Sequence, residues 1–205
     1  MFWKSAVTLA VLLLVPLAGQ AKSIEVSDDP VKGSDDAPLV LVEFGDLQCP
    51  ACLRCSKEVL PELEAAFVET GKVRLVYLDH PLEMHPRAFD AAVAAQCAGK
   101  QGKFWQYHDR IFTYLRYRPE DFEEYAGKLA LDMEAFSACL ENEEIMEGVR
   151  EDIRLAERLK LHGTPSFVLA RPKAGSGGLK VLKTFGGCPS VEDLGKKIEA
   201  QLKKG

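Results

Sequence analysis

Residues 39–52, LVLVEFGDLQCPAC, decide how this chain folds. The apolar run at 39–44 is typical of a buried strand, and the residues after it carry apolar side chains at helical spacing. Pro50 suits the first position of a helix, where its missing N–H leaves no hydrogen bond unmade. The stretch therefore predicts a strand that delivers Cys49 to the N-terminus of a helix, with Cys52 inside the first turn.

This placement predicts a redox role for the two cysteines. Unpaired N–H groups and the positive end of the helix dipole stabilise a thiolate, so the pKa of Cys49 should fall. We expect Cys49 to be the nucleophile and Cys52 the resolving partner. The competing interpretation is a metal site, because Cys55 continues the three-residue spacing. Zinc held by these cysteines with Cys188 or a histidine is that alternative. An iron–sulfur run is disfavoured, since Val59 stands where its fourth cysteine would be.

The rest of the chain predicts an α/β protein with the order β-α-β, a helical block, then β-β-α. Strands are expected at 39–45, 72–78, 165–170 and 179–185, and helices at 50–69, 86–98, 102–115, 119–129, 132–142, 143–161 and 191–203. Pro61 should kink the first helix near Val59 or break it in two. A right-handed crossover makes the first two strands parallel.

The N-terminal residues indicate export. Residues 1–21 are interpreted as a cleaved signal peptide, because an apolar run at 6–18 follows Lys4 and precedes small residues at 19 and 21; the alternative is a membrane anchor. Residues 22–38 are expected to form a loose N-terminal arm. The net charge of −5 argues against a nucleic-acid partner. The six cysteines of an exported chain can all form disulfides.

Glu43 is an acid within an otherwise apolar strand. A buried carboxylate without a partner is unfavourable, so its pKa should rise and it can hold or relay a proton. The alternatives are an outward-facing position or an ion pair with Arg74 on the neighbouring strand.

Four features in this order resemble the DsbA-like thiol–disulfide oxidoreductases of the thioredoxin superfamily, in particular their BdbD-type branch. They are EFGDLQCPAC at 43–52, QGKFW at 101–105, GTPSF at 163–167 and GG at 186–187. The resemblance implies a thioredoxin fold with an inserted all-helical subdomain. Residues 39–81 and 162–205 would form the thioredoxin-fold domain, and residues 82–161 the helical insertion.

The resemblance also implies roles for particular residues. Pro165 matches the family's cis-proline, which lets the backbone of Thr164 face the disulfide, so both join the cysteines as catalytic residues. Glu43 matches the buried acid that assists proton removal from the second cysteine.

Two further disulfides are expected. Related chains often carry a bridge within the helical domain, here Cys97–Cys139; the alternative is a pair of free buried thiols. In a thioredoxin topology the last strand runs parallel to the first, which brings Cys55 and Cys188 to the same region. Their pairing is an expectation that stands beside the alternative of two free thiols.

The function expected from these residues is extracytoplasmic thiol–disulfide exchange through Cys49–Cys52, with the protein as a disulfide donor. Partners would be exported proteins with free thiols and a membrane quinone-linked reoxidant of the DsbB or VKOR kind. We expect a periplasmic or otherwise extracytoplasmic monomer without cofactor or metal. The alternatives are a reductase or isomerase of misbonded proteins, and a non-catalytic chaperone or metal carrier on a thioredoxin scaffold.

Overall fold

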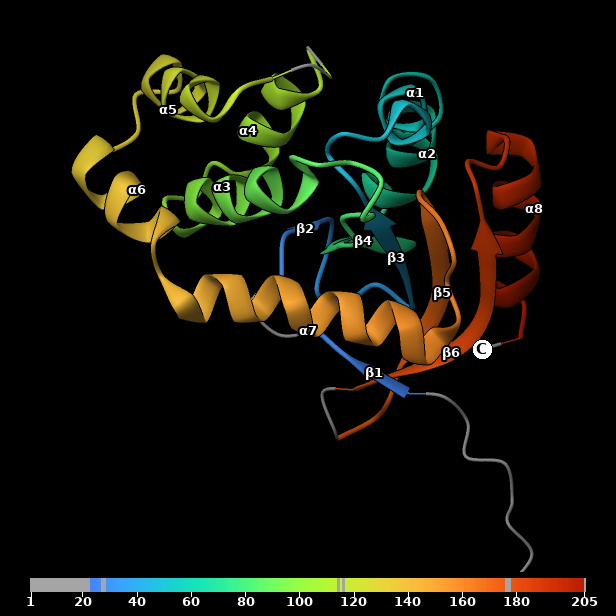
Figure 1. The fold of residues 1–205 in the computed structure, drawn as a ribbon. Helices are drawn as coiled ribbons and strands as arrows, with labels where there is room; N and C mark the ends of the chain where they lie inside the picture. Colours follow the sequence, from blue (N-terminus) through green and yellow to red (C-terminus); the bar gives the residue numbers. More distant parts are fainter. Residues whose placement is uncertain (1–22, 27–28, 114, 116, 176–177, 205) are drawn as a thin grey trace, which may run out of the picture.

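The computed structural model describes residues 23–26, 29–113, 115, 117–175 and 178–204. A six-stranded sheet forms the centre of the fold in these residues (Figure 1). The strands are β1 (Ser23–Glu25), β2 (Val31–Lys32), β3 (Leu39–Gly45), β4 (Val73–Asp79), β5 (Ser166–Pro172) and β6 (Gly178–Gly186). They lie in the order β1-β6-β5-β3-β4-β2. Strands β3 and β4 are parallel, and the other pairs are antiparallel. The expected thioredoxin-type α/β fold is confirmed.

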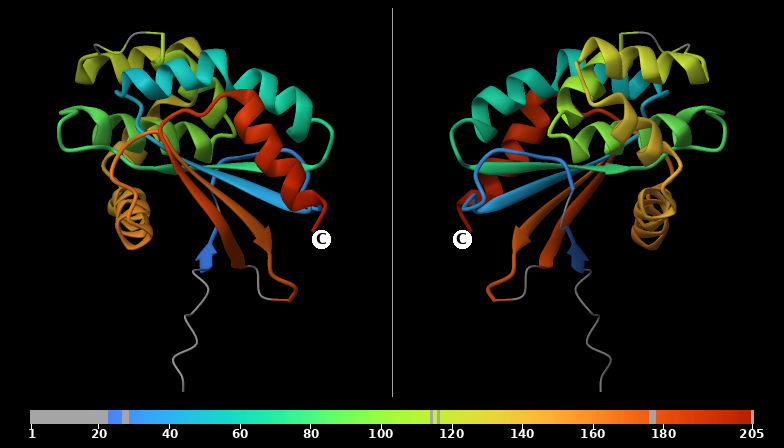
Figure 2. Two further views of the ribbon diagram at one scale, coloured as in Figure 1. Left: turned by 90° about the vertical axis from the view of Figure 1, so that its right-hand side faces the viewer. Right: turned by 90° about the vertical axis from the view of Figure 1, so that its left-hand side faces the viewer.

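Helices cover both faces of the sheet (Figure 2). They are α1 (Pro50–Glu58), α2 (Leu60–Leu63), the π-helix η1 (Glu64–Val68), α3 (Ala88–Lys100), α4 (Phe104–Ile111), α5 (Pro119–Lys128), α6 (Met133–Leu140), α7 (Glu143–Leu159) and α8 (Val191–Leu202). One apolar cluster joins a sheet face to α1, α2 and α8, and a second joins the opposite face to α7. Helices α3 to α7 follow β4 and precede β5, where the sequence predicted a helical block.

The helix that follows β3 is interrupted, as Pro61 predicted. Helix α1 ends at Glu58, Val59 has a φ of −113°, and α2 begins at Leu60. The proline lacks an N–H and its ring crowds the preceding turn, so a continuous α-helix cannot pass it undisturbed. The segment 64–68 then widens into a π-helix. The break leaves α1 as a separate short helix, with Cys49 at its N-terminus and Cys52 in its first turn.

The expectation of a loose arm at 22–38 is wrong for its described part. Strand β1 pairs with β6 and strand β2 pairs with β4, so this segment supplies both edges of the sheet. Ile24 is buried between the sheet and α7. Such short strands gain their order from the long strands beside them, which a local sequence pattern does not reveal.

The expected signal peptide at 1–21 lies outside the described residues. Among the helices of the described residues, each is either too short or too polar to cross a membrane.

Candidate active site

Cys49 occupies the N-terminus of α1. It is the N-cap residue, with Pro50 directly after it in the first helical position. Its backbone N–H donates to the carbonyl oxygen of Asp46 at 3.1 Å, which closes the loop between β3 and the helix. Strand β3 is buried along its whole length and fixes where this loop begins. The structure places Cys49 where the sequence predicted it, beyond the carboxyl end of the central strand.

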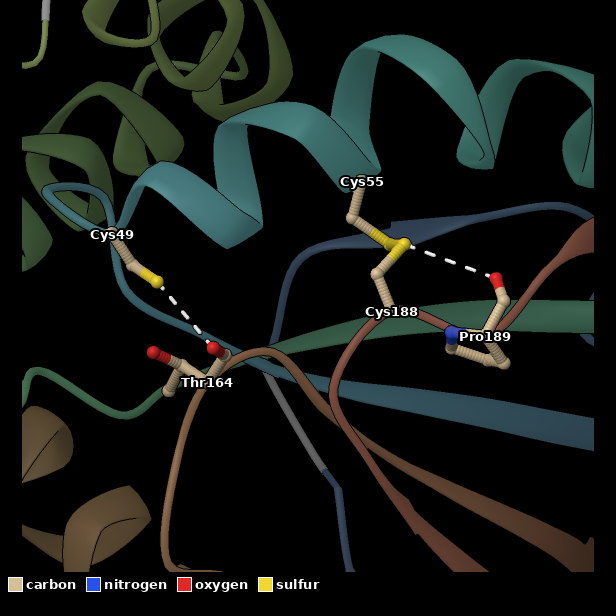
Figure 3. The surroundings of a disulfide bond; sticks show 5 residues. All are labelled: Cys49, Cys55, Thr164, Cys188 and Pro189. Atoms are coloured by element: carbon tan, nitrogen blue, oxygen red, sulfur yellow. Dashed lines mark hydrogen bonds between the residues drawn. A yellow bond between two sulfur atoms is a disulfide. The ribbon is translucent and has the colours of Figure 1, made fainter.

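The environment of Cys49 stabilises a thiolate. Its pKa is lowered to about 5, chiefly because the thiol of Cys52 donates a hydrogen bond to its sulfur. Burial opposes this shift, and the Thr164 side chain and the backbone N–H groups of Cys52 and Ala51 add to it. The Thr164–Pro165 peptide bond is cis, and Cys49 Sγ lies 3.4 Å from the Thr164 carbonyl oxygen (Figure 3). Thr164 thus stands directly against Cys49, and Pro165 follows it across the cis bond.

Cys52 has the opposite character. It is 1% exposed, and burial raises its pKa far above the ordinary range of a thiol. The hydrogen bond to Cys49 and the charge of Glu43 act in the same direction. At neutral pH the reduced pair therefore holds one thiolate, on Cys49, and one thiol, on Cys52.

Glu43 is buried on β3, and its charge acts on Cys52. Burial raises its pKa from 4.5 to about 8; Lys32 lowers it and Glu64 raises it. The alternative ion pair with Arg74 does not form: Arg74 lies against Asp35 at 3.4 Å. Lys32 in turn donates to Glu64 at 2.7 Å, so Glu43 is a partner in neither ion pair.

Asp46 organises the loop that carries Cys49, and sequence reasoning missed it. Its carboxylate accepts hydrogen bonds from the backbone N–H groups of Gln48 at 2.7 Å and Leu82 at 2.9 Å, and contacts His85 Nδ1 at 2.6 Å. Its backbone also lowers the pKa of Cys52. The available signal was a lone acid between the strand and the first cysteine; its partners lie up to 39 residues away, where no local spacing points to them.

The other four cysteines form two disulfides. Cys55 pairs with Cys188 across a Cα–Cα distance of 5.6 Å, and Cys97 pairs with Cys139 across 5.7 Å. The first bridge ties α1 to the turn before α8 (Figure 3). The metal alternative loses two of its ligands to this bridge. Across the described residues, no group of three or more Cys, His, Asp or Glu side chains is arranged to hold a metal ion.

Comparison with known proteins places this chain in a family. A family model described as Thioredoxin matches residues 25–176. Probable disulfide bond formation protein D of Bacillus anthracis is 33% identical over 182 residues, which cover 84% of this chain and 77% of that protein. The structure of oxidised BdbD from Bacillus subtilis superposes with a TM-score of 0.70 and 26% identity, covering 89% of this chain and 98% of that one.

A second kind of relative is much longer. Na(+)/H(+) antiporter NhaA 1 of Salinispora arenicola (strain CNS-205) is 34% identical over 146 residues, which cover 70% of this chain and 22% of the antiporter. The chain thus spans about a fifth of that protein's length. The antiport activity in its name is that of the longer protein.

Proposed function

This chain belongs to the thioredoxin family, as a DsbA-like thiol–disulfide oxidoreductase, and from that premise we propose that it donates its Cys49–Cys52 disulfide to protein thiols outside the cytosol. The observation that carries the direction is the environment of Cys49. A site that stabilises the Cys49 thiolate stabilises the reduced enzyme, and a stable reduced form makes the disulfide a stronger oxidant.

The reaction begins on the oxidised enzyme. A substrate thiolate attacks Cys49 Sγ, the Cys49–Cys52 bond breaks, and the electron pair leaves on Cys52. Protonated Glu43 supplies the proton that converts Cys52 to a thiol, which its pKa of about 8 permits at neutral pH. A second substrate thiolate then attacks the substrate sulfur of the mixed disulfide and releases Cys49 as a thiolate. The substrate gains a disulfide, and its two electrons remain on the enzyme dithiol.

The neighbourhood of Cys49 also suits substrate binding. The cis-peptide at Thr164–Pro165 sets the Thr164 carbonyl oxygen beside the sulfur, so an extended substrate can pair with this backbone while its own sulfur reaches Cys49. We assign this contact to the thioredoxin-fold part, residues 39–81 and 162–205. The helical insertion, 82–161, supplies apolar residues that pack around both cysteines.

The setting we propose is extracytoplasmic, with exported proteins as substrates. Disulfides persist in oxidising compartments, and this chain carries two besides its redox pair. Turnover then needs an oxidant for the dithiol, and a membrane quinone-linked protein of the DsbB or VKOR kind supplies that chemistry.

One measurement tests the direction of exchange. The purified protein is equilibrated with glutathione buffers, and its reduction potential is read from the redox state of Cys49 and Cys52. A potential less negative than about −180 mV supports a donor, whereas one near about −270 mV indicates a reductase and refutes the proposal. A Cys49→Ser variant is the control, and it should neither oxidise reduced substrate peptides nor reduce insulin. Equal activity in the variant would indicate a non-catalytic scaffold.

A further inference from the structure

Tyr77 lies beside Glu43 on the sheet face that carries α1. The parallel ladder of β3 and β4 places Glu43 opposite Tyr77 and Gly45 opposite Asp79. Side chains alternate along a strand, so Glu43, Gly45 and Tyr77 share one face. Tyr77 and Cys52 belong to the same buried apolar cluster on that face. Tyr77 therefore stands among the cysteines and the buried acid.

The hydroxyl end of Tyr77 lies directly on the backbone of Gly45. A Cβ at position 45 would come within 2.4 Å of ring atom Cε2 and 2.5 Å of the hydroxyl oxygen. Only glycine leaves room for the ring here. This contact holds the hydroxyl at the carboxyl end of β3, next to the loop that leads to Cys49.

The Tyr77 hydroxyl is buried and lacks a hydrogen-bond partner among the described residues, and so does Oε2 of Glu43. An unpaired buried hydroxyl destabilises a fold, and Tyr77 is 1% exposed. Phenylalanine would fill the same space without that penalty. Two unpaired buried oxygens on the sheet face whose apolar cluster includes Cys52 indicate a use in the reaction.

We propose that the Tyr77 hydroxyl relays a proton between Cys52 and Glu43 during exchange. When Cys52 attacks a mixed disulfide on Cys49, its thiol proton moves to the Tyr77 oxygen, while the Tyr77 hydroxyl proton moves to the Glu43 carboxylate. Cys52 becomes a thiolate, Glu43 becomes a carboxylic acid, and Tyr77 ends unchanged. The inference rests on the proposed function: this attack by Cys52 occurs when the dithiol is reoxidised, and in reverse it returns the proton to Cys52 when a substrate thiolate opens the disulfide.

Other ionisable groups face the pair, and most have partners of their own. Lys32 and Glu64 lie towards Glu43 and bind each other at 2.7 Å. Towards Tyr77 lie Asp46, Asp79 and His108. Asp46 contacts His85, and His108 contacts Asp109 at 3.0 Å. Asp79 accepts from Gln96 through Oδ2, while its Oδ1 lacks a partner among the described residues. Asp79 is thus the competing proton carrier, and the test includes it.

The aryl disulfide 5,5′-dithiobis(2-nitrobenzoic acid) separates the two steps on the reduced protein. Cys49 thiolate attacks it and releases one aryl thiolate; Cys52 then loses its proton, attacks Cys49 Sγ and releases the second. We expect Tyr77→Phe to leave the first phase unchanged and to slow the second about tenfold, the effect of losing one hydrogen bond to a charged group. The second phase should keep its dependence on the ionisation of Glu43.

Matched variants decide between the outcomes. Tyr117 also has a buried hydroxyl without a partner among the described residues, and Tyr117→Phe should leave both phases unchanged. An unchanged second phase in Tyr77→Phe overturns the proposal, as does an equal slowing of both phases. Slowing by Asp79→Asn but not by Tyr77→Phe assigns the proton to Asp79 instead. If the wild-type protein releases only one equivalent of aryl thiolate, the proposed function itself fails.

A spectroscopic measurement adds a second readout that does not depend on the rate of either phase. Infrared difference spectra between the oxidised and reduced protein should contain the carboxylic acid C=O band of Glu43, which disappears in Glu43→Gln. Under the proposal this band shifts in Tyr77→Phe and stays in place in Tyr117→Phe. If the band lies at the same position in wild type, Tyr77→Phe and Tyr117→Phe, the contact between Tyr77 and Glu43 is refuted.

Discussion

The low pKa of Cys49 can be tested by removing its hydrogen-bond donors one at a time. The thiol of Cys52 is the largest stabilising contribution, and the Thr164 side chain is a smaller one. A hydrogen bond to a charged group is worth about 1.5–3 kcal/mol, which corresponds to about 1–2 pKa units. Cys52→Ala should therefore raise the pKa of Cys49 from about 5 to roughly 6–7. Thr164→Val should raise it by less.

The assay is the rate of alkylation by iodoacetamide as a function of pH, with the labelled residue identified by mass spectrometry. At pH 6 a thiol with a pKa of about 5 is roughly nine-tenths thiolate, and this fraction should fall to between roughly one half and one tenth in Cys52→Ala. In the matched Cys49→Ala variant, Cys52 should stay unreactive at neutral pH, because its burial keeps it a thiol. A wild-type midpoint near pH 9, or a midpoint unmoved by Cys52→Ala, would refute the reasoning.

Three further predictions concern the free energy of unfolding. The pKa of Glu43 is about 8 in the folded protein and 4.5 in the unfolded chain, so the wild-type protein loses stability as the pH rises through this window. Glu43→Gln should therefore have a free energy of unfolding in urea that is roughly 3–5 kcal/mol higher than that of wild type at pH 9, and equal to it at pH 4. With both active-site cysteines replaced by serine, removal of the Cys55–Cys188 bridge, which spans 133 residues, should cost about 5 kcal/mol in urea unfolding. Removal of Cys97–Cys139, which spans 42, should cost about 4 kcal/mol, and the reverse order would contradict the loop argument. Asp46→Asn should destabilise the fold by about 2–3 kcal/mol, because buried acceptors are lost, whereas Asp90→Asn, in an exposed pair with Arg87, should change it by less than about 1 kcal/mol.

The sequence predicts those parts of the site that depend on neighbours along the chain. Cys49, Pro50 and Cys52 form one turn whose character follows from the strand before it and the helix after it. Glu43 could be identified for a similar reason, because a single acid in an apolar strand signals burial without a partner. The break near Val59 likewise follows from Pro61 alone.

The remaining parts depend on register and on distant segments. Tyr77 is an ordinary strand residue in the sequence, and it gains meaning only from the ladder that sets it opposite Glu43. Asp46 and His85 meet because the loop after β4 folds back onto the loop after β3. The Cys55–Cys188 pairing could be stated only as one of two alternatives, since helix phase and strand direction fix a region and not a distance.

The two short strands of residues 23–32 also determine when the sheet can be completed. Strand β1 pairs only with β6, and β2 pairs only with β4, so the earliest described strand waits for the latest one. Until β6 has formed, β1 has no strand to pair with, and of the two short strands before β3 only β2 can pair, with β4. Contacts of such long sequence separation form slowly. Residues 23–25 therefore pair late in folding, and they cover the Gly178–Lys180 part of the β6 edge with a very short edge strand.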